Sequence, residues 1–232
     1  MKYEEIKMMY NLEANHWWFT ARRRLIVYLF EKYCKRGLLL DLGCGTGINL
    51  STFKKFTKVK GIDSSLLALE FCRKRGHNNV VKAKAEKLPF KDNAFDTILA
   101  LDLLEHVKDD NKVLAEAYRV LKKDGILILT VPALKFLWTE HDNIFEHKRR
   151  YNTKGLKSKL EKQKYKIKKI SYWNFILFPL MMIYKFINRK SHIQPAPKPL
   201  NIILLLILSI DNFLIRYINL PYGISIICVA KK

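Results

Sequence analysis

A glycine-rich run, Asp41-Leu42-Gly43-Cys44-Gly45-Thr46-Gly47, is the first group of residues whose types and spacing could bind a ligand. It stands between a short buried strand predicted over 38–42 and a helix predicted from about Ile48 to Phe56. Glycines are needed in such a turn because side chains would hold the backbone away from the ligand. The dinucleotide fingerprint G-x-G-x-x-G fails, since the sixth position counted from Gly43 is Ile48. The run therefore predicts a nucleotide-type ligand other than NAD.

An acidic residue follows at the place where a ribose would lie. Asp63 comes twenty residues after Gly43, at the end of the second predicted strand. A carboxylate there can accept hydrogen bonds from both ribose hydroxyls. The alternative is that Asp63 caps the next helix, a role that Ser64 or Ser65 could also take. The glycine run and the acid occur at matching strand ends, which favours the ribose role.

Four side chains could act as a general base or support one. They are His106, after the fourth predicted strand, and His141, Asp142 and His147, in the loop after the fifth. The alternatives are a capping or packing role for His106 and a solvated surface loop for the others. The loop also contains Glu146, so its two histidines and two carboxylates invite a metal interpretation. Its six-residue histidine spacing lies on no helical face and no second cluster completes a site, so we expect no metal.

The elements that position these residues alternate along the chain. Strands are predicted at 38–42, 59–62, 80–84, 95–101 and 126–131, and helices at 48–56, 66–75 and 112–121. This alternation favours an α/β fold with a doubly wound parallel sheet and helices on both faces. Residues 4–36 are predicted to be helical. Their His16-Trp17-Trp18-Phe19 and Arg22-Arg23-Arg24 could form a lid over the ligand, although aromatic residues at this spacing equally suit a core.

The composition is that of a folded protein. Of the 232 residues, 49% are hydrophobic and 28% are charged, which excludes a disordered, collagen-like or disulfide-stapled chain. The four cysteines form no C-x-x-C pair, and the N-terminus lacks the pattern of a signal peptide, so we expect a reduced, cytosolic setting. Two apolar stretches, 170–184 and 199–210, are shorter than the roughly 20 residues of a membrane span. We expect them to form buried or interfacial helices.

The net charge of +22 is concentrated in the C-terminal part of the chain. Residues 1–130 contain 24 basic and 16 acidic residues, whereas the remainder contains 19 and 5. Such an excess can indicate nucleic acid, an anionic membrane surface or an acidic substrate, or it can be a general bias of composition. The sign of the charge does not choose among them.

The segments 41–47, 61–63, 85–90, 95–96, 104–107 and 116–125 together resemble class I S-adenosylmethionine-dependent methyltransferases, most closely the methyltransferase type 11 group. The resemblance covers roughly residues 37–132, and residues 220–225 with the strand after them resemble the antiparallel last strand of that Rossmann-like sheet. The resemblance implies three parts. They are an N-terminal helical cap (1–36), a methyltransferase core (37–172 and 221–232) and an apolar helical insertion before the last strand (173–220).

The resemblance also implies S-adenosylmethionine as the cofactor and assigns its contacts by position. Lys84 departs from the pattern, because many members carry there an Asp that binds the adenine amino group; backbone contacts could replace it. The implied contacts are Asp41, Gly43, Gly45 and Gly47 at the methionine end, Asp63 and Ser64 at the ribose, Ala85 and Glu86 along the adenine, and backbone of Leu101 at the amino-acid portion.

The expected function is methyl transfer to a small-molecule or lipid-linked acceptor. The insertion 173–220 could wall an apolar pocket or lie in a membrane interface, and the lysine-rich region 154–169 would favour peripheral contact with the inner face of an anionic membrane. One alternative is an RNA or other nucleic-acid methyltransferase, which the charge favours. However, residues 101–106 read Leu-Asp-Leu-Leu-Glu-His and lack the Asn/Asp-Pro-Pro-aromatic signature of base-amino methyltransferases. Another alternative is a non-catalytic cofactor-binding protein.

Overall fold

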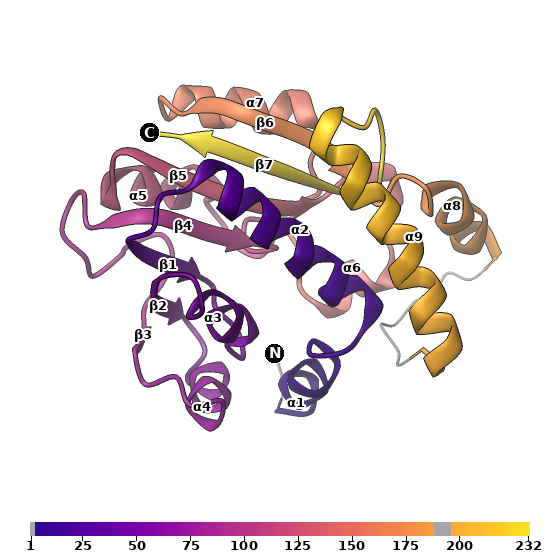
Figure 1. Ribbon diagram of the computed structural model, residues 1–232, viewed down its shortest axis with the longest axis horizontal. Coiled ribbons are helices and arrows are strands. Elements are labelled where there is room, and N and C mark those ends of the chain that lie inside the picture. Colours follow the sequence, from indigo (N-terminus) through magenta and orange to yellow (C-terminus); the bar gives the residue numbers. More distant parts are fainter. Residues whose placement is uncertain (1–2, 188–195) are drawn as a thin grey trace.

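A computed structural model describes residues 3–187 and 196–232, apart from the side chains of residues 141 and 184–187. Its centre is a seven-stranded sheet in the order β3-β2-β1-β4-β5-β7-β6 (Figure 1). Strand β7 is antiparallel to both β5 and β6, and the other pairings are parallel. The predicted doubly wound sheet with an antiparallel last strand is therefore confirmed. The strands are β1 (Leu38–Leu42), β2 (Lys58–Asp63), β3 (Val80–Lys82), β4 (Phe95–Leu101), β5 (Leu121–Pro132), β6 (Lys166–Trp173) and β7 (Ser225–Lys231).

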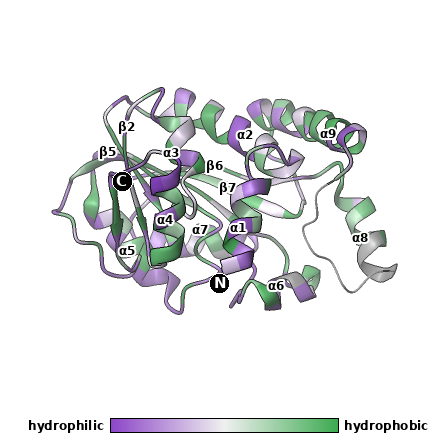
Figure 2. Cartoon of the chain, turned by 90° about the horizontal axis from the view of Figure 1, so that it is seen from below, coloured by the Kyte–Doolittle hydropathy of each residue, from purple (hydrophilic) through white to green (hydrophobic). Residues whose placement is uncertain are grey.

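The central strands are apolar on both faces because helices cover both sides of the sheet. Helices α2 and α9 lie on one face, with α5 and α7 on the other (Figures 1 and 2). The helices are α1 (Tyr3–Leu12), α2 (Trp17–Tyr33), α3 (Ile48–Phe53), α4 (Leu66–Lys74), α5 (Asp110–Val120), α6 (Glu140–Ile144), α7 (Thr153–Lys162), α8 (Phe178–Ile187) and α9 (Lys198–Tyr217), with a 3₁₀ turn at Lys135–Leu137.

The strand register brings the candidate ligand residues to one edge of the sheet. Asp41 in β1 lies opposite Gly61 in β2 and Leu99 in β4. The carboxyl ends of these parallel strands therefore open onto the same crevice, the usual ligand position in such sheets.

The N-terminal region differs from the single helix predicted over 4–36. It consists of α1 and α2, separated at residues 13–16, and the side chain of His16 accepts a hydrogen bond from the Trp18 N–H at the start of α2. The break lets α1 turn away from α2 and pack against α4. Local periodicity did not reveal the break, because both segments are compatible with helix.

The apolar insertion also differs in extent from the prediction. Helix α9 continues past Asp211 to 20 residues, and among the described helices it alone is long and apolar enough to cross a membrane by length and composition. The stretch 170–184 is shared between β6 and α8. Asp211 is fully buried and accepts hydrogen bonds from the N–H groups of Phe175 (2.6 Å) and Ile176 (3.3 Å). The C-terminal half of α9 is thus docked on the protein by polar contacts.

Candidate active site

The glycine-rich run forms a tight turn between β1 and α3. The N–H groups of Gly43 and Cys44 both donate to the carbonyl of Ile62 (2.9 and 2.8 Å), which fastens the turn to the end of β2. Gly47 has φ +87°, and a Cβ there would lie 2.9 Å from the Cys72 sulfur. Gly45 has φ +54°, and a Cβ built there would meet nothing within 4 Å. At Gly45 the turn therefore presents bare backbone to open space, as close approach to a ligand requires.

Asp63 is held against this turn. Its Oδ2 accepts the Gly45 N–H (3.0 Å) and its Oδ1 accepts the Ser65 N–H (2.8 Å). The N-cap of α4 is Ser65, whose hydroxyl accepts the Ala68 N–H (3.3 Å), while Ser64 is exposed. The alternative role of Asp63 as the helix cap therefore falls to Ser65. The half-buried Asp63 carboxylate is fixed where the two strand ends meet.

Asp41 is a buried carboxyl group in need of a partner. It is 1% exposed, and its Oδ2 has no hydrogen-bond partner within the described chain. Burial, together with the nearby charge of Asp63, raises the pKa of Asp41 to about 7. Arg22 of α2 pairs with Asp102 beside the same strand ends, and its Nε is also without a partner among the described residues. A ligand that carries both donors and acceptors, such as the amino acid portion of S-adenosylmethionine, fits these two atoms.

The segment predicted to lie along an adenine follows β3. Ala85 is buried, Glu86 is half-buried and Lys84 is exposed. Leu101 ends β4 and is buried. The burial and position of these residues are compatible with the contacts to adenine and to the amino-acid portion, which stay a prediction.

Two side chains of α5 that the sequence analysis did not single out hold the turn at residues 88–90. Glu116 of α5 accepts the Leu88 N–H (2.7 Å), and Arg119 donates to the carbonyls of Leu88 (3.1 Å) and Phe90 (2.8 Å). Both residues lie in the 116–125 segment that carried the family resemblance, which was the available signal.

The N-terminal region covers the glycine-rich turn through Glu13, a residue that no sequence pattern indicated. The Glu13 carboxylate accepts hydrogen bonds from the Thr46 hydroxyl and from Arg75 (2.9 Å). Burial raises the pKa of Glu13 to about 7 although Arg75 opposes the shift. Trp18 packs on the buried Trp173 with ring centroids 4.9 Å apart, so this aromatic residue packs against the core. The cap contacts the turn through a carboxylate at the helix break.

The structure brings three of the four predicted base residues together. The rings of His106 and His147 lie edge to face with centroids 4.7 Å apart, and His147 Nδ1 lies 2.8 Å from Asp142 Oδ1. The side chain of His141 lies outside the described residues, so its role stays a prediction. Glu105, which sequence reasoning overlooked although it precedes His106, lies in the same group: its carbonyl accepts the Lys148 N–H (2.6 Å). The fold thus supplies the second cluster that the loop alone lacked.

Burial and hydrogen bonds together set the charges of this group. Burial and the neighbouring His147 lower the pKa of His106 to about 4, so its ring is neutral at pH 7. Burial also raises the pKa of Glu105 well above its usual range, with Asp102 adding to the effect. Burial opposes ionisation of Asp142, but hydrogen bonds from His147 and Arg150 outweigh it and hold the Asp142 pKa well below its usual range. Asp142 is therefore a carboxylate at pH 7.

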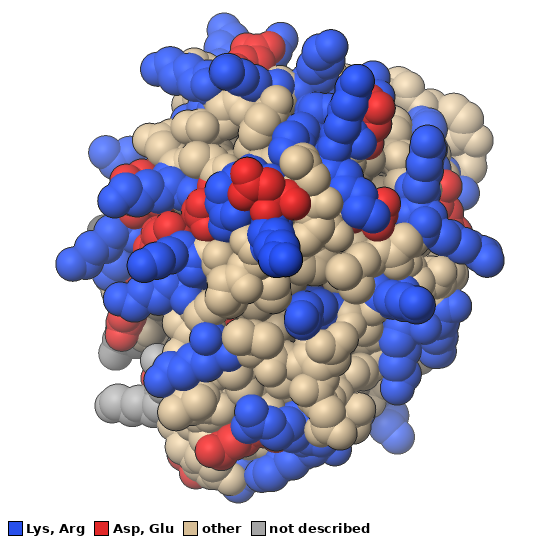
Figure 3. Space-filling view, turned by 90° about the vertical axis from the view of Figure 1, so that its left-hand side faces the viewer, with Lys and Arg blue, Asp and Glu red and all other residues tan. Residues whose placement is uncertain are grey.

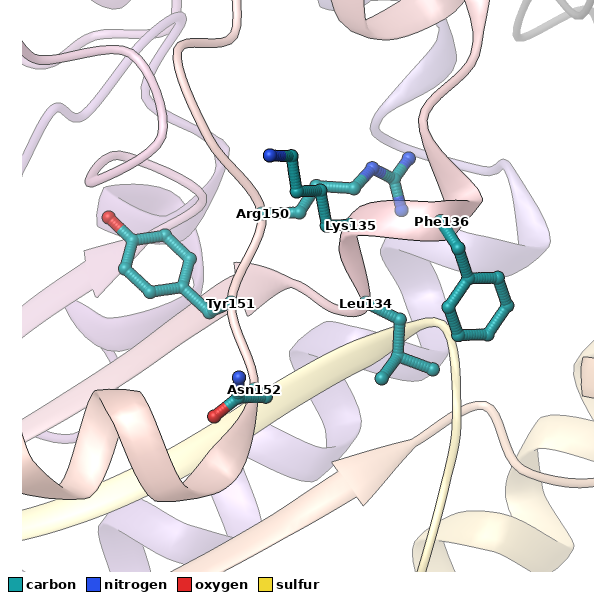
Figure 4. Close-up of a pocket in the computed structure, with 6 residues that line it drawn as sticks. All are labelled: Leu134, Lys135, Phe136, Arg150, Tyr151 and Asn152. Carbon is teal, nitrogen blue, oxygen red and sulfur yellow. The ribbon is translucent and has the colours of Figure 1, made fainter.

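An open surface pocket of about 620 Å³ borders this group. Figure 4 shows Arg150 and Lys135 close together, with Leu134 and Phe136 on another side. Arg150 also pairs with Asp142 (2.8 Å), so the pocket adjoins the histidine group, while none of its lining residues belongs to the glycine-rich turn. The lining residues are Leu134, Lys135, Phe136, Arg150, Tyr151 and Asn152.

Comparisons with known proteins agree with this geometry. Residues 40–129 match a family model described as a methyltransferase domain. An uncharacterized protein of Methanocaldococcus jannaschii is 33% identical over 171 residues, which cover 72% of this chain and 63% of that protein. A ubiquinone/menaquinone biosynthesis C-methyltransferase of Vibrio cholerae is 37% identical over 102 residues, or 39% of each chain. The chain thus spans less than two thirds of the length of these relatives.

A solved structure matches over nearly the whole chain. It is a methyltransferase from Thermotoga maritima, described as a possible histamine N-methyltransferase, with a TM-score of 0.66 and 22% identity over 99% of this chain and 95% of that one. At this identity the likeness shows the fold. Residues 40–129 therefore form a methyltransferase domain, and the chain has the fold of the class I S-adenosylmethionine-dependent methyltransferases.

Proposed function

We propose that this protein is an S-adenosylmethionine-dependent methyltransferase that acts on a small-molecule or lipid-linked acceptor. The observation that carries the proposal is the Asp63 carboxylate held 3.0 Å from the Gly45 N–H, at the open glycine-rich turn and beside the unpartnered oxygen of Asp41. The match of residues 40–129 to a methyltransferase domain supports it. S-adenosylmethionine, when bound, supplies an electrophilic methyl group.

In this proposal the residues of the chain bind the cofactor, orient the acceptor and limit the access of water. Asp63 accepts hydrogen bonds from the ribose, Asp41 accepts from the amino group, and the turn allows close backbone approach. Arg22 supplies a positive charge at the same strand ends. Glu13 keeps the N-terminal segment over the turn, which limits access of water. Holding the acceptor in line with the methyl group provides most of the rate in such a transfer.

The His147–Asp142 pair can accept a proton if the acceptor must lose one. Asp142 is fully buried and orients the His147 ring through Nδ1 (2.8 Å), as a carboxylate that supports a histidine base does. The adjoining pocket, with Arg150 and Lys135 beside apolar side chains, suits an acceptor that has both a polar and an apolar part.

A lipid-linked acceptor is supported by the apolar surface of α8 and α9. Several apolar side chains along α9 are about half exposed or more, and much of this helix is green, that is hydrophobic, in Figure 2. An apolar surface of this kind is typical of contact with lipid or with a partner. The buried Asp211 and its backbone partners favour a helix that lies on a membrane over one that leaves the protein to cross it. The exposed α9 residues are Leu200, Ile202, Ile203, Leu206, Ile210, Phe213 and Tyr217.

The basic charge supports an anionic membrane more than a nucleic-acid groove. Figure 3 shows the face opposite α8 and α9, where Lys and Arg side chains are dispersed among Asp and Glu side chains and uncharged surface and do not gather in one groove. Such a spread is compatible with general attraction to an anionic surface.

Calorimetric titration tests the cofactor. The wild-type chain should bind S-adenosylmethionine and not NAD, and Asp63→Ala should bind it about 10- to 100-fold more weakly, since hydrogen bonds to a charged group are lost. Asp63→Asn, which keeps an acceptor for the Gly45 N–H, should lose less. Glu70→Ala on the exposed side of α4 is the control and should bind as wild type does. Wild-type affinity in both Asp63 variants would contradict the assignment.

Vesicle binding tests the membrane contact. The chain should sediment with vesicles that contain phosphatidylglycerol, and Leu206→Asp (61% exposed) should weaken this binding. Leu66→Asp on α4 (52% exposed) is the matched control, because it adds the same charge to a comparably exposed leucine outside α8 and α9. Equal binding by both variants would contradict the contact.

A further inference from the structure

The fold brings together three side chains of the types that bind transition metals. Glu105 and His106 follow β4, and His147 follows α6 in the connection after β5. One ligand atom from each of the three lies within 4.8 Å of the others. Strands β4 and β5 are parallel neighbours, and the Lys148 N–H donates to the Glu105 carbonyl (2.6 Å), so the two segments are fastened to each other at the strand ends.

Glu105 has a buried oxygen that nothing in the described chain satisfies. Its residue is 1% exposed, and its Oε2 lacks a hydrogen-bond partner among the described residues. A buried polar atom of this kind costs several kcal/mol unless a partner compensates it, and almost all such atoms in proteins have one. The atom therefore indicates a ligand that the protein itself does not supply.

Hydrogen bonds around His147 fix its ring in the way that is usual for a histidine that binds a metal. Asp142 engages His147 through Nδ1 (2.8 Å), which fixes the orientation of the imidazole ring within the group. Asp142 is in turn held by two bonds from Arg150 (2.8 and 2.9 Å) and by the Thr139 N–H (2.7 Å). A histidine that binds a metal almost always has its other nitrogen on a carboxylate or carbonyl, which fixes the ring and its tautomer.

We propose that Glu105, His106 and His147 form a binding site for one divalent transition-metal ion. Two imidazole nitrogens and one carboxylate suit Zn²⁺, Fe²⁺, Co²⁺ or Mn²⁺ better than Ca²⁺ or Mg²⁺, which prefer oxygen ligands. Three protein ligands leave coordination positions open, as in catalytic metal sites.

An open position gives the ion a role in the proposed reaction. With the ion bound, His147 is a ligand and no longer the proton acceptor; the ion would instead bind an oxygen of the acceptor and stabilise its deprotonated form. This role would select acceptors that carry a hydroxyl or similar oxygen, and it rests on the proposed methyl transfer. The binding of the ion itself does not depend on that proposed function.

Metal titration of the whole chain tests the site. The purified protein is stripped with a chelator and titrated with ZnCl₂ and MnCl₂ by calorimetry, and with CoCl₂ by visible absorption, which reports nitrogen ligation. About one ion per chain should bind, with the same stoichiometry by elemental analysis. Glu105→Gln and His147→Gln should weaken binding at least tenfold. Asp142→Asn should weaken it about 10- to 100-fold through its effect on His147.

A matched control separates the site from other histidines. His77 is buried and hydrogen-bonded to Ser51 (2.7 Å), and His77→Gln should bind metal as wild type does. Circular dichroism of each metal-free variant excludes unfolding as the cause, and Glu105→Gln is nearly isosteric. Failure of all three ions to bind, or unchanged binding in both Glu105→Gln and His147→Gln, would refute the proposal. Cofactor titration of the metal-free protein keeps the two proposals apart: cofactor binding without metal binding refutes only the site, and the reverse refutes only the proposed function.

Discussion

Asp41→Asn should make the protein more stable at neutral and alkaline pH while it weakens cofactor binding. Burial raises the pKa of Asp41 from 3.8 to about 7, so between these values the folded state holds a proton that the unfolded state releases. The wild-type free energy of unfolding therefore falls as pH rises through this window, by about 1.4 kcal/mol per pH unit. The whole window corresponds to about 4 kcal/mol. Asparagine stays neutral, so the variant avoids this loss.

The variant also has a local partner. The Oδ1 of Asn49 is buried without a hydrogen-bond partner among the described residues, and Asn49 lies within hydrogen-bonding range of Asp41. An amide at position 41 can donate to it, as the protonated carboxyl of Asp41 can, so the variant keeps above pH 7 a hydrogen bond that the ionised wild-type side chain cannot make.

Urea unfolding followed by tryptophan fluorescence, from pH 4 to pH 8.5, measures the effect. The difference between Asp41→Asn and wild type should be small near pH 4 and approach about 4 kcal/mol above pH 7. Glu70→Gln removes one negative charge from the exposed side of α4 and should show no such pH dependence. A difference that is constant across this range would refute the reasoning from burial, and unchanged cofactor affinity would remove Asp41 from the binding site.

Three further predictions concern the supports of the site. Asp211→Ala should lower the free energy of unfolding by about 2–3 kcal/mol, because the N–H groups of Phe175 and Ile176 lose their acceptor. Hydrogen exchange in residues 198–217 should become faster, and an unchanged exchange rate would contradict the docking of α9. Gly61→Ala should lower the free energy of unfolding, measured in urea, by about 1–3 kcal/mol, since its Cβ would lie 2.8 Å from the Cys44 sulfur and 2.9 Å from Leu50. A stability equal to that of wild type would show that this contact relaxes freely. Glu13→Gln should speed proteolysis within residues 1–16 at pH 8, where Glu13 is ionised and paired with Arg75. At pH 5 the pKa of about 7 keeps Glu13 protonated, so the variant should be cleaved as fast as wild type. The same ratio of variant to wild-type rates at both pH values would argue against the pairing.

The sequence by itself determined the fold class and the cofactor side of the site. Alternating apolar strands and helices specify a parallel sheet, and in such a sheet the residues that directly follow each strand meet at one edge. The glycine-rich run and Asp63 could therefore be paired from their positions along the chain. Gly47 and Ser65 start the helices after their strands by local backbone geometry, which short-range sequence also encodes.

Contacts between distant segments were decided only by the tertiary structure. The break after α1 places Glu13 on Thr46, 33 residues away, although the local pattern favours one continuous helix. Glu105 and His106 meet His147 because β4 and β5 are neighbours in the sheet, and the side chains beyond their ends are positioned by packing and not by periodicity. The second apolar stretch ends just before Asp211, yet the folded chain buries Asp211, which accepts hydrogen bonds from backbone N–H groups 35 and 36 residues away. Glu13 and Asp211 tolerate burial because distant partners compensate them, and no local pattern records which partners those are.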